Sequence, residues 1–122
     1  MTNVVAVAVD AVDAVDAVDA GSIRRFWAAA LERPVPFTWD VPTGRTYVEL
    51  AGDPALLFQP VPEGKAGKNR LHLDLAPVGR TQDEEVIRLV GLGATVLDEA
   101  DGFPWVVLAD PEGNEFCVLP PR

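Results

Sequence analysis

The sequence predicts an α+β fold, because both halves of the chain run through the same order of elements. Apolar alternation indicates a strand, then a helix, then three more strands, and this order occurs twice. Phe58-Gln59 in the first half stands where Phe116-Cys117 stands in the second. We therefore expect a single domain over residues 1–122, built from a βαβββ module at about 1–62 and another at about 69–122.

The first module begins with a strand over Asn3–Val9, in which valines and alanines alternate between the two faces. Ser22 is a favourable N-cap for a helix over Ile23–Glu32, whose apolar residues have helical spacing. Pro34 and Pro36 follow that helix and would end it. Turns containing Pro and Gly then separate three predicted strands, Phe37–Asp40, Arg45–Ala51 and Ala55–Val61.

The triplet Ala-Val-Asp occurs four times in succession over Ala8–Asp19. A period of three matches neither a strand nor a helix, so we interpret the repeat as an expansion within or just after an edge strand. A calcium loop is the alternative, but the triplets lack the glycine turn and the bidentate glutamate of such a loop. We reject it and expect the fold to tolerate the loss of one triplet.

The second module is predicted to begin with a strand over Arg70–Ala76, with His72 and Asp74 on one face and three leucines on the other. A helix over Gln82–Val90 should follow, with acidic residues in its first turn and with Gly91 and Gly93 ending it. The remaining predicted strands are Ala94–Asp98, Trp105–Ala109 and Glu115–Leu119.

Composition excludes several functional classes. Ten Lys and Arg against 19 Asp and Glu give a net charge of −9, which would repel a nucleic-acid backbone. One cysteine excludes an internal disulfide, and one histidine excludes a two-histidine metal site within one chain. No stretch is long and apolar enough to span a bilayer, and no basic residue precedes the first apolar run. These features predict a cytoplasmic protein with no membrane or nucleic-acid partner.

Four strings, in this order and at these separations, carry a resemblance to a known family: Phe26-Trp27, Lys68–Asp74, Leu92–Ala94 and Asp110–Cys117. From about residue 21 to the C-terminus, the chain resembles the vicinal oxygen chelate superfamily, in its glyoxalase-like or bleomycin-resistance-like branch common in actinobacteria. The resemblance implies that each module's mixed sheet curls into a cup, with the helices on the outer face. It further implies a small-molecule cavity and a homodimer.

Metal-dependent members of that superfamily place one ligand on the first strand and one on the last strand of each module. Carried over by position, three of these ligands fall on Gln59, His72 and Cys117, the last in place of the usual glutamate. The fourth falls in the Val/Ala/Asp stretch, which contains no histidine, so this ligand is absent unless an aspartate of the repeat serves. An imidazole and an amide bring no negative charge, so we expect no stoichiometric metal and no cofactor, although a Cys117 thiolate would suit zinc.

The predicted ligand cavity contains Gln59, His72, Asp74, Trp105 and Cys117, and no catalytic residue is assigned. His72 is interpreted as a cavity histidine hydrogen-bonded to Asp74 or Gln59, and Cys117 as either a buried apolar residue or half of a Cys–His pair. The strand aromatics Trp39, Phe58 and Trp105 either stack on a flat ligand or simply pack.

A basic cluster of Lys65, Lys68 and Arg70 either meets an anionic ligand group or, as we favour, forms a solvated loop. The leading functional hypothesis is metal-independent binding of a small organic ligand, for sequestration or resistance. The alternative is a metal-dependent lyase, isomerase or dioxygenase with a degenerate metal site.

Overall fold

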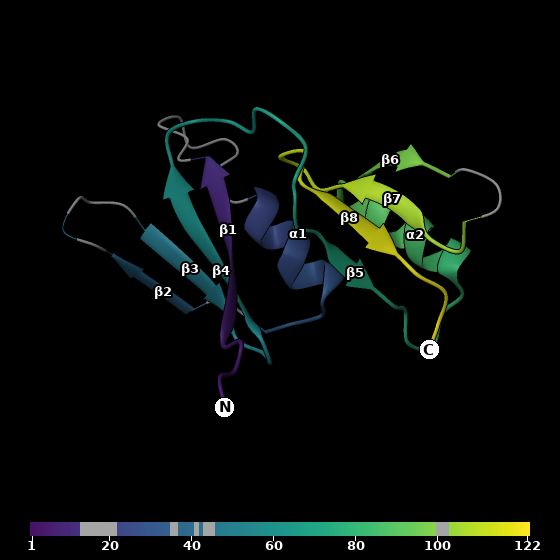
Figure 1. Ribbon diagram of the computed structural model, residues 1–122, viewed down its shortest axis with the longest axis horizontal. Helices are drawn as coiled ribbons and strands as arrows, with labels where there is room; N and C mark the ends of the chain where they lie inside the picture. The colour runs from purple at the N-terminus through teal and green to yellow at the C-terminus, as the bar shows by residue number, and fades with distance from the viewer. Residues whose placement is uncertain (13–21, 35–36, 41, 43–45, 100–102) are drawn as a thin grey trace. The chain divides into compact units, whose positions relative to one another are not determined.

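The computed structural model describes residues 1–12, 22–34, 37–40, 42, 46–99 and 103–122. The chain divides into two compact units, Met1–Gly64 and Lys65–Arg122. In the described residues, each unit contains one helix and one four-stranded mixed sheet, in the order strand, helix and three strands (Figure 1). The predicted α+β fold of two βαβββ modules is therefore confirmed. No helix in these ranges has the length and apolar character needed to cross a membrane.

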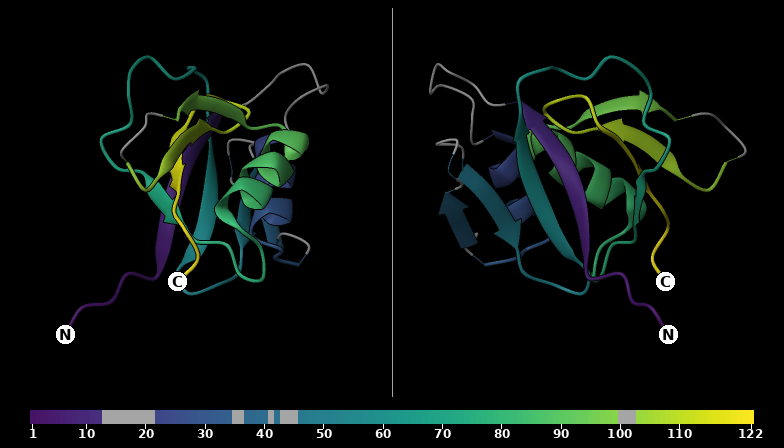
Figure 2. Two further views of the ribbon diagram at one scale, coloured as in Figure 1. Left: turned by 90° about the vertical axis from the view of Figure 1, so that its right-hand side faces the viewer. Right: turned by 60° about the vertical axis from the view of Figure 1, so that its left-hand side comes forward.

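In the first unit the sheet has the strand order β1-β4-β3-β2, with β1 parallel to β4 and the other neighbours antiparallel. Helix α1 lies along one face of this sheet (Figure 2). Its apolar residues Ile23, Phe26 and Trp27 are at most 3% exposed, as their helical spacing predicts. The elements are β1 (Ala6–Val12), α1 (Ser22–Ala30), β2 (Phe37–Asp40), β3 (Thr46–Leu50) and β4 (Ala55–Val61).

Strand β1 begins and ends three residues later than the predicted Asn3–Val9. It pairs with β4 over the full length of both strands, from Ala6 beside Ala55 to Val12 beside Val61. This pairing draws the start of the Ala-Val-Asp repeat into an edge strand and buries Ala11. The repeat beyond Val12 lies outside the described residues.

Helix α1 ends at Ala30, two residues before the predicted Glu32. Glu32 adopts a left-handed backbone conformation with φ of 51°, and the N–H of Arg33 bonds to the carbonyl of Ala28 at 3.0 Å. This arrangement caps the C-terminus before Pro34 is reached. A backbone cap, and not proline, therefore ends the helix.

In the second unit the strand order is β5-β8-β7-β6, with β5 parallel to β8. Helix α2 packs on one face of this sheet, where Phe116, Leu108 and Val118 are at most 1% exposed. Leu89 on α2 is fully buried, consistent with a core between helix and sheet. The elements are β5 (Leu73–Leu75), α2 (Gln82–Leu92), β6 (Thr95–Asp98), β7 (Val106–Ala109) and β8 (Glu115–Val118).

Two predictions for the second unit were wrong in detail. Gly91 lies inside α2, and only Gly93, with φ of 122°, ends the helix by donating its N–H to the carbonyls of Leu89 and Val90. Strand β5 is shorter than the predicted Arg70–Ala76 because its pairing with β8 covers only three residues. Leu71 consequently precedes the strand and is fully exposed instead of packing with the other leucines.

The Asp-Pro-Glu-Gly-Asn string closes the hairpin between β7 and β8. Asp110 is 3% exposed, and its carboxylate accepts hydrogen bonds from the backbone N–H groups of Glu112 and Asn114, at 2.9 and 3.0 Å. Gly113 supplies the positive φ of 89° that the turn requires. The turn fixes the antiparallel register that places Val107 beside Cys117.

Candidate functional site

A pocket of about 300 Å³ opens on the sheet face opposite α2 in the second unit. Its position follows from strand register, because the Cα partners of Cys117 are Asp74 on β5 and Val107 on β7. These three side chains form one row across the sheet, and residues two positions away along each strand share their face. The lining residues are Lys68, His72, Asp74, Trp105, Val107, Glu115, Cys117 and Leu119.

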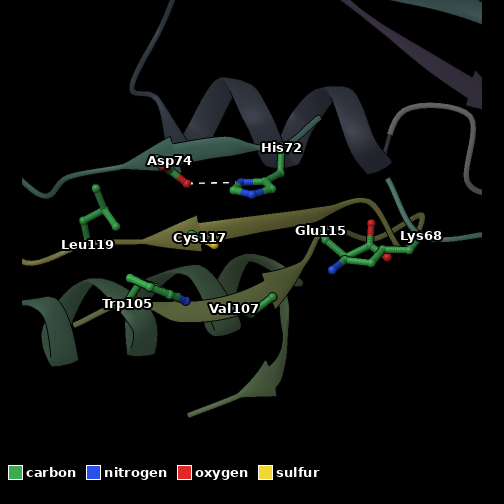
Figure 3. A pocket seen from close by; sticks show the side chains of 8 residues that line it. All are labelled: Lys68, His72, Asp74, Trp105, Val107, Glu115, Cys117 and Leu119. Atoms are coloured by element: carbon green, nitrogen blue, oxygen red, sulfur yellow. Dashed lines mark ion pairs between the residues drawn. The ribbon is translucent and has the colours of Figure 1, made fainter. Parts of the chain in front are cut away.

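The pocket has a charged end and an apolar end (Figure 3). Lys68 and Glu115 lie at one end, and Leu119 lies at the other with Trp105 near it. Antiparallel pairing of β7 with β8 produces this arrangement, since Val106 is beside Val118 and the residues flanking that pair are Trp105 and Leu119. The pocket can therefore contact a molecule with one polar and one apolar part.

Trp105 is positioned by its neighbours in the chain and in space. The side-chain amide of Gln82, at the start of α2, donates to the carbonyls of Pro104 and Val118 at 2.8 and 2.9 Å. The rings of Phe103 and Trp105 lie 5.1 Å apart in a tilted arrangement. Trp105 remains 39% exposed, so its indole is available for stacking.

His72 and Asp74 form a pair at the pocket edge, with 3.1 Å between the His72 Nδ1 and Asp74 Oδ1 atoms. Both side chains are about half exposed, at 44% and 51%. The close approach of the Asp74 carboxylate to Nδ1 orients the imidazole ring. Of the predicted cavity residues, His72, Asp74, Trp105 and Cys117 thus line one pocket. Gln59 belongs to β4 in the first unit, and its place beside His72 stays a prediction.

Cys117 is buried, and burial raises the pKa of its thiol above the usual value. The charge of Asp74 and a hydrogen bond to Asp74 raise the pKa further, while Lys68 opposes them. A reactive cysteine needs the opposite shift, toward the thiolate. The surroundings of Cys117 therefore favour a thiol and give no support to a nucleophilic Cys–His pair.

Glu115 joins the loop at residues 65–69 to the start of β8. Lys65 Nζ lies 2.8 Å from the Glu115 Oε1 atom, and the backbone N–H of Asn69 donates to Oε2 at 3.0 Å. The hydrogen bond from Lys65 and that from Asn69 lower the pKa of Glu115 to about 2. Lys65 also donates to the carbonyl of Gly67. The same contacts bring Lys68 to the pocket. The loop residues Lys65 and Lys68 are exposed, which is consistent with the predicted solvated loop.

The strand registers identify the position that matches His72 in the first unit. Val9 and Asp10 pair with Phe58 and Gln59, as Leu73 and Asp74 pair with Phe116 and Cys117. The residue before Val9 is Ala8, which therefore corresponds to His72. Alanine offers no donor atom, so this position of the first unit cannot supply a metal ligand.

A different set of donors does gather within the second unit. Ligand atoms of His72, Asp74 and Cys117 all lie within 4.8 Å of one another. Asp74 and Cys117 are cross-strand partners, and His72 lies two residues before Asp74. Sequence reasoning placed all three in the cavity but did not pair Asp74 with Cys117, because register is a tertiary property. It also missed Val107 and Leu119, which the alternation on β7 and β8 would have assigned to this face.

Comparison with known proteins supports the assignment of the fold. The chain matches the family model of the glyoxalase-like domain over residues 12–119. It has no match among curated proteins. At identities below one fifth, the similar solved structures show the shared fold alone.

Each of the following three similar structures covers nearly the whole chain. TnmS3, an antibiotic binding protein from Streptomyces sp. CB03234, is 18% identical, with a TM-score of 0.63 over 100% of this chain and 98% of that one. A glyoxalase/bleomycin resistance/dioxygenase family enzyme from Burkholderia phytofirmans PsJN is 16% identical, with a TM-score of 0.66 over 96% and 97%. The fosfomycin resistance protein FosX from Listeria monocytogenes is 10% identical, with a TM-score of 0.75 over 100% and 93%.

The family match covers most of the chain, whose two units each have the order strand, helix and three strands. The chain belongs to the glyoxalase-like domain family.

Proposed function

We propose that this protein binds a small organic ligand in the pocket of its second unit, and that binding does not require the four-ligand metal centre of related metalloenzymes. The observation that carries the proposal is the pocket itself, which joins a charged end at Lys68 and Glu115 to an apolar end at Trp105 and Leu119. Its volume of about 300 Å³ is at the lower limit for sites of drug-sized ligands. Ala8 occupies the position in the first unit that is equivalent to His72, and its side chain has no metal-donor atom, which supports ligand binding without that metal centre.

The pocket chemistry favours a flat, apolar compound that carries an anionic or hydrogen-bond-accepting group. The indole of Trp105, which is 39% exposed, offers a stacking surface, and Lys68 offers a positive charge at the other end of the pocket. Among the similar structures, TnmS3 is described as an antibiotic binding protein. A role in sequestering or resisting such a compound follows for this chain as part of the proposal.

A metal-dependent lyase, isomerase or dioxygenase is the second candidate function. One observation favours it, which is the gathering of donor atoms from His72, Asp74 and Cys117. A chelator distinguishes the two candidate functions. Metal-independent binding predicts that the ligand still binds in the presence of a strong chelator, whereas the metal-dependent enzyme predicts that ligand binding is lost.

The test uses 8-anilinonaphthalene-1-sulfonate, an aromatic anion, as the probe, titrated calorimetrically into the full chain in EDTA. We expect saturable one-to-one binding, weakened about fivefold by Trp105→Ala, because an aromatic contact contributes on the order of 1 kcal/mol. Lys68→Ala should weaken binding and remove its dependence on salt. Glu99→Gln, at an exposed carboxylate outside the pocket, serves as the control. Unsaturable binding, or equal affinity of the Trp105→Ala variant, would contradict the proposal.

The proposal includes a cytoplasmic homodimer with no nucleic-acid partner, supported by the family resemblance and by the net charge of −9. Sedimentation equilibrium should give twice the chain mass of 13.1 kDa. A monomer at micromolar concentration would contradict the dimer and leave the ligand pocket, which lies within one unit, unaffected.

A further inference from the structure

We propose that His72, Asp74 and Cys117 form a site for a thiophilic divalent cation, with Zn²⁺ as the preferred ion. The three donors lie within one module. His72 and Cys117 stand at two of the ligand positions that the family resemblance implies, and Asp74 is a donor that the resemblance does not assign. This site goes beyond the proposed function, which requires no metal.

The first argument is geometric. In a tetrahedral zinc site, sulfur lies at about 2.3 Å and nitrogen or oxygen at about 2.0–2.2 Å from the ion, so ligand atoms lie about 3.3–3.8 Å apart. The donor atoms of His72, Asp74 and Cys117 already lie within 4.8 Å of one another. Movements of about 1 Å would bring them to coordinating distance, and the half-exposed His72 and Asp74 side chains have the freedom to make them.

The backbone holds the two strands of the site in register. Asp74 and Cys117 are direct Cα partners in the parallel pair β5–β8, where Leu73 and Leu75 are paired with Phe116 and Val118. Phe116 and Val118 are at most 1% exposed and fix β8 against the core. The sulfur donor therefore sits on a rigid strand and the oxygen donor beside it, as a metal site with defined geometry requires.

The second argument concerns charge and donor type. A neutral imidazole, one carboxylate and one thiolate carry two negative charges, which balance Zn²⁺. The sequence-based expectation of no metal counted the neutral amide of Gln59 as the third donor. Replacing it with the Asp74 carboxylate removes the objection that the site lacks negative charge. A thiolate also favours zinc over Mn²⁺ and Mg²⁺, which prefer oxygen ligands.

Coordination changes the protonation of the cysteine. The Cys117 S–H bond breaks, an S–Zn bond forms, and one proton passes to the buffer for each ion bound. The ion then takes the place of the proton in a setting where burial disfavours a free thiolate. The exposed side of His72 and Asp74 leaves a coordination position open to water or to a donor atom of a pocket ligand.

The experiment titrates Co²⁺, Zn²⁺, Mn²⁺ and Mg²⁺ into the full chain after removal of metal by a chelator. We expect one Co²⁺ per chain, with a sulfur-to-cobalt charge-transfer band in the near ultraviolet and the intense visible bands of tetrahedral cobalt. Zn²⁺ should displace Co²⁺, and equal concentrations of Mn²⁺ or Mg²⁺ should not. These readouts are independent of any enzymatic activity.

Variants assign the donors. Cys117→Ser should remove the charge-transfer band, and His72→Gln and Asp74→Asn should each weaken Co²⁺ binding by about 10–100-fold. The last two substitutions are at half-exposed positions, so they test the site even if Cys117→Ser disturbs the core. Glu99→Gln is the control and should bind Co²⁺ like the wild type.

Three results would overturn the inference. One is a cobalt spectrum without the sulfur band, and another is Mn²⁺ binding as tight as Zn²⁺ binding. The third is cobalt binding that is unchanged in all three variants, which would assign the ion to acidic residues elsewhere. None of these results bears on binding of the aromatic probe in EDTA, so failure here and failure of the proposed function are distinguishable.

Discussion

Glu115 provides a sensitive test of how the pocket's charged end is held together. Its carboxylate accepts from Lys65 Nζ at 2.8 Å and from the Asn69 backbone N–H at 3.0 Å, and so joins the loop at residues 65–69 to β8. Glu115→Gln keeps the shape of the side chain and one acceptor oxygen but removes the charge. We expect it to weaken both hydrogen bonds and to lower the free energy of unfolding.

The magnitude follows from the pKa of the carboxyl group. A pKa lowered from 4.5 to about 2 would correspond to about 3.4 kcal/mol at 1.36 kcal/mol per unit. The Lys65 and Glu115 side chains are 22% and 17% exposed, so solvent screening reduces this figure, and we expect about 1–2 kcal/mol.

The sign of the pH dependence is fixed, because the pKa is lowered on folding. The stabilisation is fully present above pH 4.5 and is lost as the pH falls toward about 2, so roughly half or less should remain at about pH 3.

Urea denaturation of the wild type and of Glu115→Gln, from pH 7 down to pH 3, measures this difference. Glu99→Gln removes the same charge at an exposed position and should change the free energy of unfolding by no more than about 0.5 kcal/mol. Equal stability of Glu115→Gln and wild type at pH 7 would refute the reasoning. So would a difference that stays constant across the whole pH range, because it would show that the charge of Glu115 is not its source.

Three further predictions concern the fold. Gly93→Ala should destabilise the protein by about 1 kcal/mol, because the backbone φ at this position is 122°. Gly91 lies inside α2, and no atom lies within 4 Å of a Cβ added there, so Gly91→Ala should stabilise the protein by about 0.5–1 kcal/mol. Thermal unfolding of both variants tests whether α2 ends at Gly93. Deleting Ala11–Asp13 brings the next triplet into β1 with the same Ala-Val sequence, so the thermal transition should be nearly unchanged, and its collapse would make the repeat length structural. Phe116→Ala should cost about 3–5 kcal/mol, since this side chain is 1% exposed, and a loss below 1 kcal/mol in urea would contradict its place in the core.

Much of the architecture is local in origin and could therefore be predicted from the sequence. Alternation identified Phe37–Asp40 and Ala55–Val61 with the same bounds as β2 and β4. Acidic residues after Thr81 located the start of α2, where the Thr81 hydroxyl accepts from the N–H of Glu84 at 3.1 Å. The Asp110–Asn114 string predicted a turn because its bonds lie within a few residues.

Element ends were less predictable, because they depend on partners distant in the chain. Pairing with β4 carried β1 on to Val12, and the short pairing with β8 limited β5 to Leu73–Leu75. The helix end at Ala30 depends on a left-handed Glu32, a conformation that nothing in its residue type requires.

For the site, the sequence determined which side chains share a strand face, and the tertiary structure decided which strands lie side by side. Alternation alone put His72 with Asp74, and Glu115 with Cys117. Only the pairing of β5 with β8 brought the Asp74 carboxylate to the Cys117 sulfur, and only the folded loop brought Lys65 to Glu115. The physical reason is that side-chain direction repeats every two residues along one strand, whereas register depends on the core packing and turns of the whole module.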